Sequence, residues 1–365
     1  MEGTMNTTGS PLWNMTEETL NVMETTMNSS ENHSLITGAA LKACDAWHPV
    51  QNFILPLVYL LVLFIGLFSN FIALLIFLQN ARKIKKAIRV YLINLTLADI
   101  MFNVTLPFWV VYYFKGGDWV FSEAMCRMAG VFYYVATYSA ITFMILISIN
   151  RYCTVQKTKL PIPLNEPTGS LYTSVFVWMF WVACGIPALL QQQTTRWGLH
   201  ATRCFEEQSE GRTYVYASFI FFLISFLFVI LSYVSIMKAL SSQRNILQGM
   251  HRRMARSMVL GMLIVFLVCV LPYHLSLIPW ELSKANTKGT PGCAPLKGID
   301  IVHKLNLALL SMNSCVDPII YCFSVKRFRR ELKKIFRKLA LRLPFQAHTI
   351  EASETQIRSN SVTTS

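Results

Sequence analysis

The sequence predicts an all-α membrane protein: a seven-transmembrane helix bundle followed by a C-terminal amphipathic helix at the membrane interface. Its 365 residues are 53% hydrophobic and only 14% charged, whereas soluble domains carry about a quarter charged residues. The hydrophobic residues fall in seven stretches, each meeting the roughly 20 residues that a membrane-spanning helix needs. We place the spans at 53–78, 88–113, 124–153, 171–191, 214–239, 255–281 and 299–323.

Basic residues cluster in short loops on one side of these spans. The loop after the first span carries five Lys or Arg within residues 82–89, and the loop after the fifth carries five within residues 238–256 and no acid. The positive-inside rule therefore predicts a multi-pass plasma-membrane protein with an extracellular N-terminus and a cytoplasmic C-terminus. We assign the net charge of +14 to this topology and not to nucleic-acid binding.

The segments outside the bundle (51–325) have different compositions. Residues 1–50 are rich in Ser, Thr and Asn and predict a disordered extracellular tail. Four Asn-x-Ser/Thr acceptors predict its glycosylation, at Asn6, Asn14, Asn28 and Asn32. Residues 326–343 predict an amphipathic cytoplasmic helix on an anionic membrane surface, because apolar and basic residues fall on opposite faces. The Ser/Thr-rich residues 344–365 predict a disordered cytoplasmic tail.

Two acidic residues lie inside predicted spans, where ionisable groups are costly and usually functional. Asp99 lies in span two and Asp317 in span seven, next to Pro318. Three polar residues complete a predicted buried knot: Asn70, Asn313 and Ser314. Carboxylates with amide and hydroxyl groups could hold Na⁺ or a shared proton, and hydrogen bonding between helices explains them equally well. We expect no metal beyond this Na⁺ and no other cofactor.

The motifs "GLFSN", "NLTLAD", "NRY", "FLVCVLPYH" and "DPIIYCF" occur in this order on the predicted spans. Together they resemble the class A (rhodopsin-like) G-protein-coupled receptors over about residues 53–340. The resemblance implies a receptor, and not an enzyme, that answers an extracellular ligand by activating heterotrimeric G proteins. It also implies receptor kinases and arrestin as partners of the C-terminal tail.

The resemblance assigns activation roles to eight residues: Asn150, Arg151, Tyr152, Tyr233, Pro272, Asp317, Pro318 and Tyr321. In the family, the arginine matching Arg151 is freed on activation to meet the G protein. The sequence departs from the family in four places. Asn150 replaces the usual Asp before Arg151, and Arg252 lies near the position where many members carry an acidic partner on span six. Val270 replaces a common Trp before Pro272, and span five has no proline. These departures put the basal activity and the usual bulge of span five in doubt.

The resemblance also implies two extracellular disulfides. Cys126 and Cys204 match the bond that the family has between span three and the second outer loop. Cys44 and Cys293 match a second bond found in some nucleotide and chemokine receptors. The remaining cysteines lie within spans and are expected to be reduced.

Ten residues face the ligand by the family's pattern: Trp109, Arg127, Tyr133, Tyr134, Tyr138, Phe205, Tyr273, His274, His303 and Lys304. Many aromatic rings with a few cations suit an amphiphilic anion such as a phospholipid. Stretches such as "TRCFEEQSEG" and "LPYHLSLIPWEL" resemble a class member that binds a phospholipid mediator, although Phe219, Leu277 and Lys304 differ from it. Three alternatives stay open: an orphan receptor, a receptor for a nucleotide or another lipid, and a non-coupling scavenger receptor.

Overall fold

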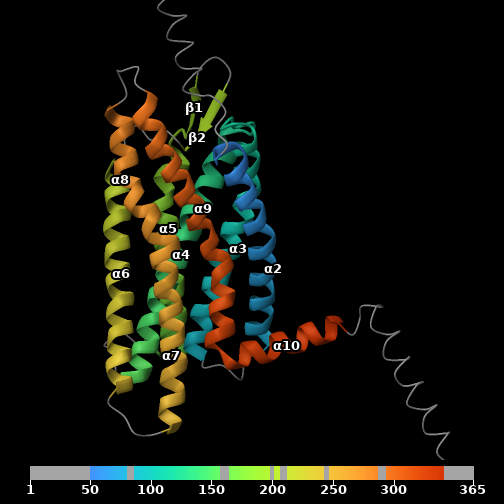
Figure 1. The fold of residues 1–365 in the computed structure, drawn as a ribbon, viewed down its shortest axis with the longest axis vertical. Helices are drawn as coiled ribbons and strands as arrows, with labels where there is room; N and C mark the ends of the chain where they lie inside the picture. Colours follow the sequence, from blue (N-terminus) through green and yellow to red (C-terminus); the bar gives the residue numbers. More distant parts are fainter. Residues whose placement is uncertain are drawn as a thin grey trace, which may run out of the picture.

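A computed structural model describes residues 50–79, 86–156, 164–197, 201–205, 212–241, 246–286 and 293–340. In this part of the chain, seven segments are long and apolar enough to cross a membrane. They form the predicted bundle, with strands β1 and β2 at one end and α10 at the other (Figure 1). We call these the hairpin end and the α10 end. The four predicted glycosylation sites, Cys44 and the C-terminal tail lie outside the described residues.

The observed spans agree with the predicted ones to within a few residues. The elements are α2 (Leu55–Gln79), preceded by a π-helical turn (Val50–Ile54), α3 (Lys86–Phe114), α4 (Glu123–Gln156), α5 (Pro167–Leu190), β1 (Thr194–Trp197), β2 (Ala201–Cys204), α6 (Arg212–Ser241), α7 (Ile246–Val265), α8 (Leu271–Asn286), α9 (Cys293–Ser324) and α10 (Lys326–Ala340). Strands β1 and β2 pair in antiparallel register, with Thr194 opposite Cys204.

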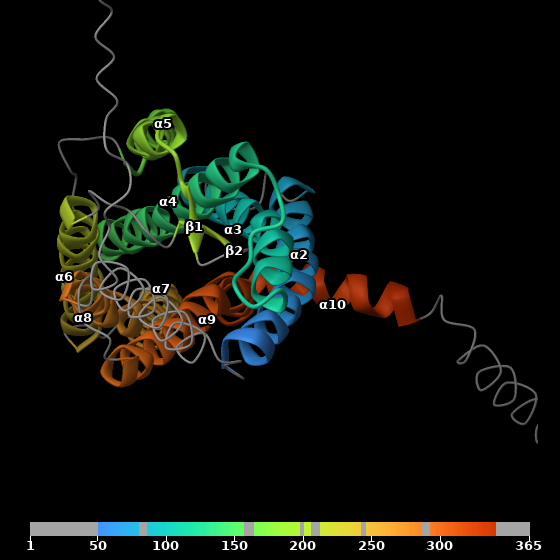
Figure 2. The same ribbon diagram turned by 90° about the horizontal axis from the view of Figure 1, so that it is seen from above.

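Helix α4 organises the bundle. It contacts α3, α5, α6 and α7. In its most apolar 18-residue stretch, 72% of the residues are buried, whereas the corresponding fraction for α5 is 11%. Seen from the hairpin end, α5 lies at the periphery (Figure 2). Small side chains explain part of this difference, because α4 buries residues such as Ala136, Ser139 and Ala140 that let its neighbours approach closely.

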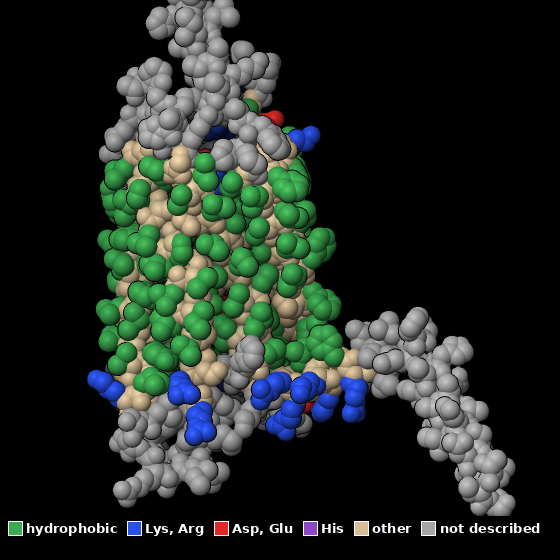
Figure 3. All heavy atoms as spheres, in the orientation of Figure 1, with side chains coloured by type: hydrophobic (Ala, Val, Ile, Leu, Met, Phe, Trp, Pro, Cys, Tyr) green, Lys and Arg blue, Asp and Glu red, His purple; other side chains and the backbone are tan. Residues whose placement is uncertain are grey.

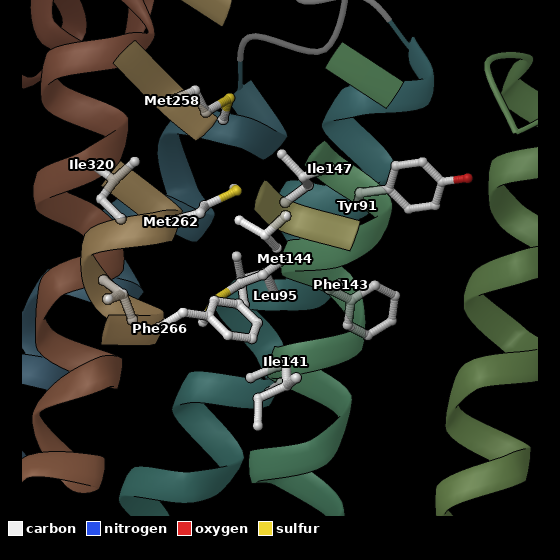
Figure 4. Packing of buried hydrophobic residues seen from close by; sticks show 14 of the residues in the cluster. Tyr91, Leu95, Ile141, Phe143, Met144, Ile147, Met258, Met262, Phe266 and Ile320 are labelled. Carbon is white, nitrogen blue, oxygen red and sulfur yellow. The ribbon is translucent and has the colours of Figure 1, made fainter. Parts of the chain in front are cut away.

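The core at the α10 end is apolar and rich in methionine. Figure 4 shows Met262 of α7 reaching toward Met144 and Ile147 of α4, with Leu95 and Phe266 beside them. These five side chains are fully buried. Because methionine is flexible and polarizable, this core can fill the space between helices in more than one arrangement.

Span six contains a feature that the sequence did not predict. A π-helical turn (Phe266–Val270) separates α7 from α8, and the N–H of Leu271 donates to the carbonyl of Phe266. The turn lies directly before Pro272, which cannot donate a backbone hydrogen bond. π-Turns occur mostly at functional sites. By contrast, α6 is helical throughout, in keeping with the missing proline of span five.

Helix α10 lies against the end of the bundle through an apolar face. Phe328 is buried and its ring lies 5.5 Å from Phe77 and 5.9 Å from Tyr321. Its exposed side chains include Arg329, Lys333 and Arg337. Lys and Arg side chains gather at this end, below a broad hydrophobic band (Figure 3). The described helix ends at Ala340, and residues 341–343 of the predicted helix lie outside the described part.

We predict that Gly66→Ala destabilises the bundle. A Cβ at this position would lie 2.7 Å from Asn103 Oδ1 and 2.9 Å from Nδ2. Either the Asn103 side chain, whose Nδ2 donates to the carbonyl of Asp99 at 2.7 Å, would have to shift, or α2 and α3 would have to separate. Overpacking of this kind costs about 1–3 kcal/mol. Thermal unfolding of the purified protein in detergent should show a lower midpoint. Gly298→Ala is the control, because a Cβ there meets nothing within 4 Å; equal midpoints for the two variants would contradict the prediction.

Candidate functional site

Two of the predicted ligand-binding aromatics belong to the packing between α3 and α4. The ring of Trp109 lies 5.9 Å from each of the rings of Tyr112, Trp119 and Tyr133. Tyr133 also lies 4.8 Å from Phe102. Trp109 and Tyr133 are 9% and 7% exposed. These contacts give both residues a structural role at the hairpin end of the bundle.

Most of the other predicted aromatics meet across α4, α6, α8 and α9. We call this set the tyrosine–histidine cluster: Tyr134, Tyr138, Tyr214, Tyr273, His274 and His303. Tyr134 lies 5.1 Å from Tyr214, and Tyr273 lies 5.0 Å from His274 and 5.4 Å from His303. The rings of Tyr134 and Tyr138 stack with their centroids 6.3 Å apart. The sequence did not single out Tyr214, which lies at the first residue of a predicted span.

Phe205 joins this cluster from the position directly after β2. Its backbone has a φ of 59°, an uncommon left-handed conformation for a bulky residue. It follows Cys204, whose disulfide to Cys126 at the start of α4 is confirmed, with Cα atoms 5.8 Å apart. The Phe205 ring lies against Gly130 so closely that a Cβ there would overlap it, and it is 5.9 Å from Tyr134. Disulfide and glycine together hold this ring over the cluster.

Both predicted cations of the ligand site already have carboxylate partners. Arg127 Nε donates to Glu123 Oε1 at 2.7 Å, and its Nη1 donates to the carbonyl of Leu189 at 3.2 Å. Lys304 Nζ lies 2.6 Å from Asp300 Oδ2 and also donates to Gln51. A ligand phosphate would therefore have to share these cations with Glu123 or Asp300.

Glu123 has a second role that the sequence analysis missed. Its Oε1 accepts the backbone N–H of Gln193 at 2.7 Å, and its Oε2 accepts that of Thr194 at 3.0 Å. One carboxylate thus joins α4, Arg127 and the start of β1. Asp118 acts similarly on the partner strand, where its Oδ1 accepts the N–H of Thr202 at 2.8 Å.

The predicted polar knot lies between α2, α3 and α9. Asn70 Nδ2 donates to the carbonyls of Gly66 and Ser314, at 2.9 and 2.7 Å. The carboxyl groups of Asp99 and Asp317 are buried and close enough to interact. Several buried acceptor oxygens of the knot have no hydrogen-bond donor among the described residues: Asn70 Oδ1, Asp99 Oδ2, Asn313 Oδ1 and both carboxylate oxygens of Asp317. Asn103, which the sequence analysis did not name, adds its Oδ1 to this group.

An all-oxygen acceptor set of this kind fits a hard cation such as Na⁺. It fits equally a shared proton, because two carboxylates in contact favour one neutral partner. No group of three or more His, Cys, Asp or Glu side chains suited to a metal ion occurs within the described ranges.

Arg151 lies at the α10 end of α4, and no carboxylate in the described part of the chain pairs with it. Its Nε instead contacts the Met258 sulfur of α7 at 3.3 Å. Asn150, which occupies the family's usual Asp position, donates from Nδ2 to Asn165 Oδ1 at 2.7 Å. Tyr152 is half-buried beside them. The guanidinium is therefore held by packing and a weak sulfur acceptor.

The other predicted activation residues lie on α6, α8 and α9. Tyr321 is fully buried, with its ring 5.3 Å from Phe77. Tyr233 of α6 is half-buried. The carbonyl of Pro272 accepts from Asn306 Nδ2 at 3.0 Å, which links α8 to α9. Pro318 follows Asp317 within α9. The Cys293 side chain and Cys44 lie outside the described residues, so their predicted disulfide stays a prediction.

We predict that Glu123→Ala speeds amide hydrogen exchange at Gln193 and Thr194 by roughly 10- to 100-fold, because each loses a hydrogen bond to a charged acceptor. Exchange read by mass spectrometry at residue resolution measures this. Asp118→Ala is the matched control and should act on Thr202 instead. The prediction is wrong if either variant speeds both sets of amides equally.

Comparison with known proteins agrees with the fold. The family model "7 transmembrane receptor (rhodopsin family)" matches residues 69–321. The platelet-activating factor receptor of Bos taurus is 32% identical over 293 residues, covering 76% of this chain and 84% of that protein. The human platelet-activating factor receptor is 30% identical, covering 80% and 89%.

A third relative, G-protein coupled receptor 183 of Bos taurus, is 27% identical and covers 90% of this chain and 96% of its own length. All three relatives are receptors without enzymatic activity, in agreement with the prediction that the chain is not an enzyme. The resemblance to class A receptors that the motifs indicated is confirmed, and the chain belongs to the rhodopsin family of seven-transmembrane receptors.

Proposed function

We propose that the chain is a plasma-membrane receptor for an extracellular phospholipid mediator, with platelet-activating factor as the first candidate, and that it activates heterotrimeric G proteins. The similarity to platelet-activating factor receptors over more than three quarters of the chain supports this. The hairpin end faces the extracellular side and the α10 end the cytoplasm. Lys and Arg gathered at the α10 end support this orientation (Figure 3).

The observation that supports G-protein coupling is the contact of Arg151 with a sulfur atom in place of a carboxylate within the described residues. Breaking a buried ion pair is strongly unfavourable, but Arg151 has no such pair to break within the described residues. Its Nε contact is the Met258 sulfur, and thioether sulfur is only a weak acceptor. Outward movement of α7 would carry Met258 away and leave the guanidinium for a partner protein. The carboxylates of a G protein's C-terminal segment are suitable acceptors.

The ligand half of the proposal rests on the tyrosine–histidine cluster and on Lys304. Aromatic faces suit the alkyl chain of a lipid, and an ammonium group suits its phosphate. The ion pair between Lys304 and Asp300 lies at the hairpin end, where a polar head group entering from outside would meet it. The Phe205 ring lies against the cluster, 5.9 Å from Tyr134.

The ion pairing of both cations favours one alternative, a receptor for a lipid whose head group is uncharged. Arg127 and Lys304 are each neutralised by an acid, so neither adds net charge to the site. The phosphate proposal requires that a ligand compete with Asp300 for Lys304. Variants of these two residues separate the alternatives.

The polar knot fits a Na⁺ ion bound between Asp99 and Asp317, with amide oxygens of Asn70 and Asn313 completing the acceptors. Such an ion would stabilise the arrangement of α2, α3 and α9 seen here, since it binds this arrangement in preference to others. Receptor kinases and arrestin are proposed partners of the Ser/Thr-rich C-terminal tail, because phosphate groups add negative charge that basic surfaces recognise.

We expect Arg151→Ala to lower G-protein activation by roughly tenfold or more, because a charge-assisted contact with the G protein is lost. Guanine-nucleotide exchange on a panel of G proteins, without ligand and with platelet-activating factor, measures this in cells. Arg196→Ala is the control, an exposed arginine on the hairpin at the other end. Unchanged exchange in Arg151→Ala, at equal surface expression, argues for a non-coupling receptor.

We expect opposite effects from the two partners of the outer ion pair. Lys304→Gln should lower the potency of a phosphate-bearing lipid, and Asp300→Asn should raise it because the ammonium group of Lys304 is freed. Each variant should change the potency by roughly 3- to 30-fold. Lys115→Gln, at an exposed position of the same end, is the control. Dose–response curves for nucleotide exchange measure the potencies. Equal potencies in all variants favour the uncharged head group.

A further inference from the structure

His274 occupies a fully buried position on α8, within the tyrosine–histidine cluster. Its ring stacks on Phe222 of α6, with centroids 4.5 Å apart and planes at 12°. Its Nδ1 lies 2.9 Å from the carbonyl oxygen of Val270. A carbonyl oxygen can only accept, so Nδ1 carries the proton of this hydrogen bond.

The other ring nitrogen of His274 has no partner. Nε2 is buried and forms no hydrogen bond within the described residues. A buried ring without a carboxylate partner is neutral, because burying an unpaired charge is very costly. With the proton on Nδ1, Nε2 therefore presents a lone pair and can only accept. A buried acceptor left without a donor is unfavourable, and such atoms in a native structure call for an external partner.

The neighbours of His274 are uncharged and partly polar. Tyr273 and Tyr138 lie edge-on to its ring, at 5.0 and 6.2 Å. Their phenol groups can donate and accept hydrogen bonds. A small polar group that itself both donates and accepts would fit among them better than an ion would.

A continuous line of side chains connects this position to the hairpin end. Tyr273 lies 5.4 Å from His303, which stacks on Trp280 at 4.1 Å. Trp280 Nε1 donates to Asp300 Oδ1 at 3.0 Å, and Asp300 pairs with Lys304. An amphiphile whose head group lies at Lys304 could therefore place a polar group near His274 along this wall of α8 and α9.

We propose that His274 Nε2 accepts a hydrogen bond from a free hydroxyl group of the ligand, so that the receptor prefers a hydroxyl-bearing lipid over the same lipid with that hydroxyl blocked. This rests on the proposed function only in assuming a lipid ligand. Platelet-activating factor carries no hydrogen-bond donor, whereas its 2-lyso form has one hydroxyl at the glycerol carbon that otherwise bears the acetyl group. Within the proposed class of phospholipid ligands, the inference therefore puts the lyso form ahead of platelet-activating factor itself and predicts it as the stronger agonist.

Two matched lipid pairs test this. The first is the 2-lyso form of platelet-activating factor with platelet-activating factor itself. The second, which lacks phosphate, is 1-monooleoylglycerol with its diacetyl derivative. Nucleotide exchange is measured for the wild type, His274→Phe and His274→Gln. Phe keeps the stack on Phe222 but has no acceptor, and Gln restores an acceptor oxygen near the position of Nε2.

The expected result is roughly tenfold higher potency of the hydroxyl-bearing member on the wild type. His274→Phe should remove this preference by lowering the potency of the hydroxyl-bearing member more than that of the blocked member, and His274→Gln should restore part of it. Nitrogen NMR of histidine-labelled protein adds a readout without signalling: the His274 Nε2 resonance, assigned by its loss in His274→Phe, should shift on addition of the hydroxyl-bearing lipid only.

The outcomes separate the two proposals. Preference for the blocked lipid, or an equal loss for both members in His274→Phe, overturns the hydroxyl inference and leaves the phospholipid proposal standing. If only the phosphate-free lipids activate exchange, and the hydroxyl-bearing member is still preferred, the phospholipid proposal is overturned and the hydroxyl inference is supported. Silence of both pairs together with an unshifted Nε2 resonance overturns both, and indicates that water fills the position.

Discussion

The loss of water as a hydrogen-bonding partner inside the membrane shapes this bundle more than any single contact. Most buried hydroxyls donate a hydrogen bond to a backbone carbonyl of their own helix. Those of Thr96, Thr137 and Ser148 donate to the carbonyl four residues earlier. Such bonds need no neighbouring helix and so leave the helices free to shift. Within the described residues, the largest group of buried polar atoms without a hydrogen-bond partner lies in the polar knot, and a smaller group lies in the tyrosine–histidine cluster.

The two ends of the bundle restrain their charges differently. At the hairpin end, Arg127 and Lys304 each have a carboxylate partner, and a disulfide joins α4 to β2. At the α10 end, the guanidinium of Arg151 meets a thioether within a methionine-rich core. Ion pairs and a covalent bond fix geometry, whereas methionine adapts to several arrangements. The hairpin end is therefore the more rigid part and the α10 end the part able to rearrange.

The sequence predicted the spans well because a membrane-length apolar stretch carries its own signal. The ends of all seven spans agree with the structure to within a few residues. The polar knot could also be predicted, since a buried carboxylate such as Asp99 stands out in any apolar run. The sequence analysis missed the π-turn at Phe266–Val270, because backbone geometry of this kind depends on packing against α6 and α9. Met258 was missed for a similar reason, since nothing in its local sequence marks it as a partner of Arg151.

The ion pairs at the hairpin end are a different case. Glu123 precedes Arg127 by four residues and Asp300 precedes Lys304 by four, the spacing at which opposite charges meet on one helical face. This signal was present in the sequence, but both cations were assigned to the ligand by resemblance alone. Counting the acids one turn away would have shown that neither cation adds net charge. Resemblance proposed the ligand-binding residues, and the helical spacing shows which acids lie beside their cations.

The π-turn gives the proposed ligand contact a mechanical consequence. His274 Nδ1 donates to the carbonyl of Val270, the last residue of the turn, and Phe266 at its start stacks near Phe222, on which His274 also stacks. Many family members carry a Trp where Val270 stands, and a large ring at that position could sense a ligand by direct contact. Val270 cannot do so, because it is small and fully buried. Under the hydroxyl proposal, a ligand that binds Nε2 changes the position of the imidazole and hence the hydrogen bond to Val270. This movement would reach α7 through the π-turn, where the helix is least regular. Because Met258 lies on α7, its distance from Arg151 would change as well.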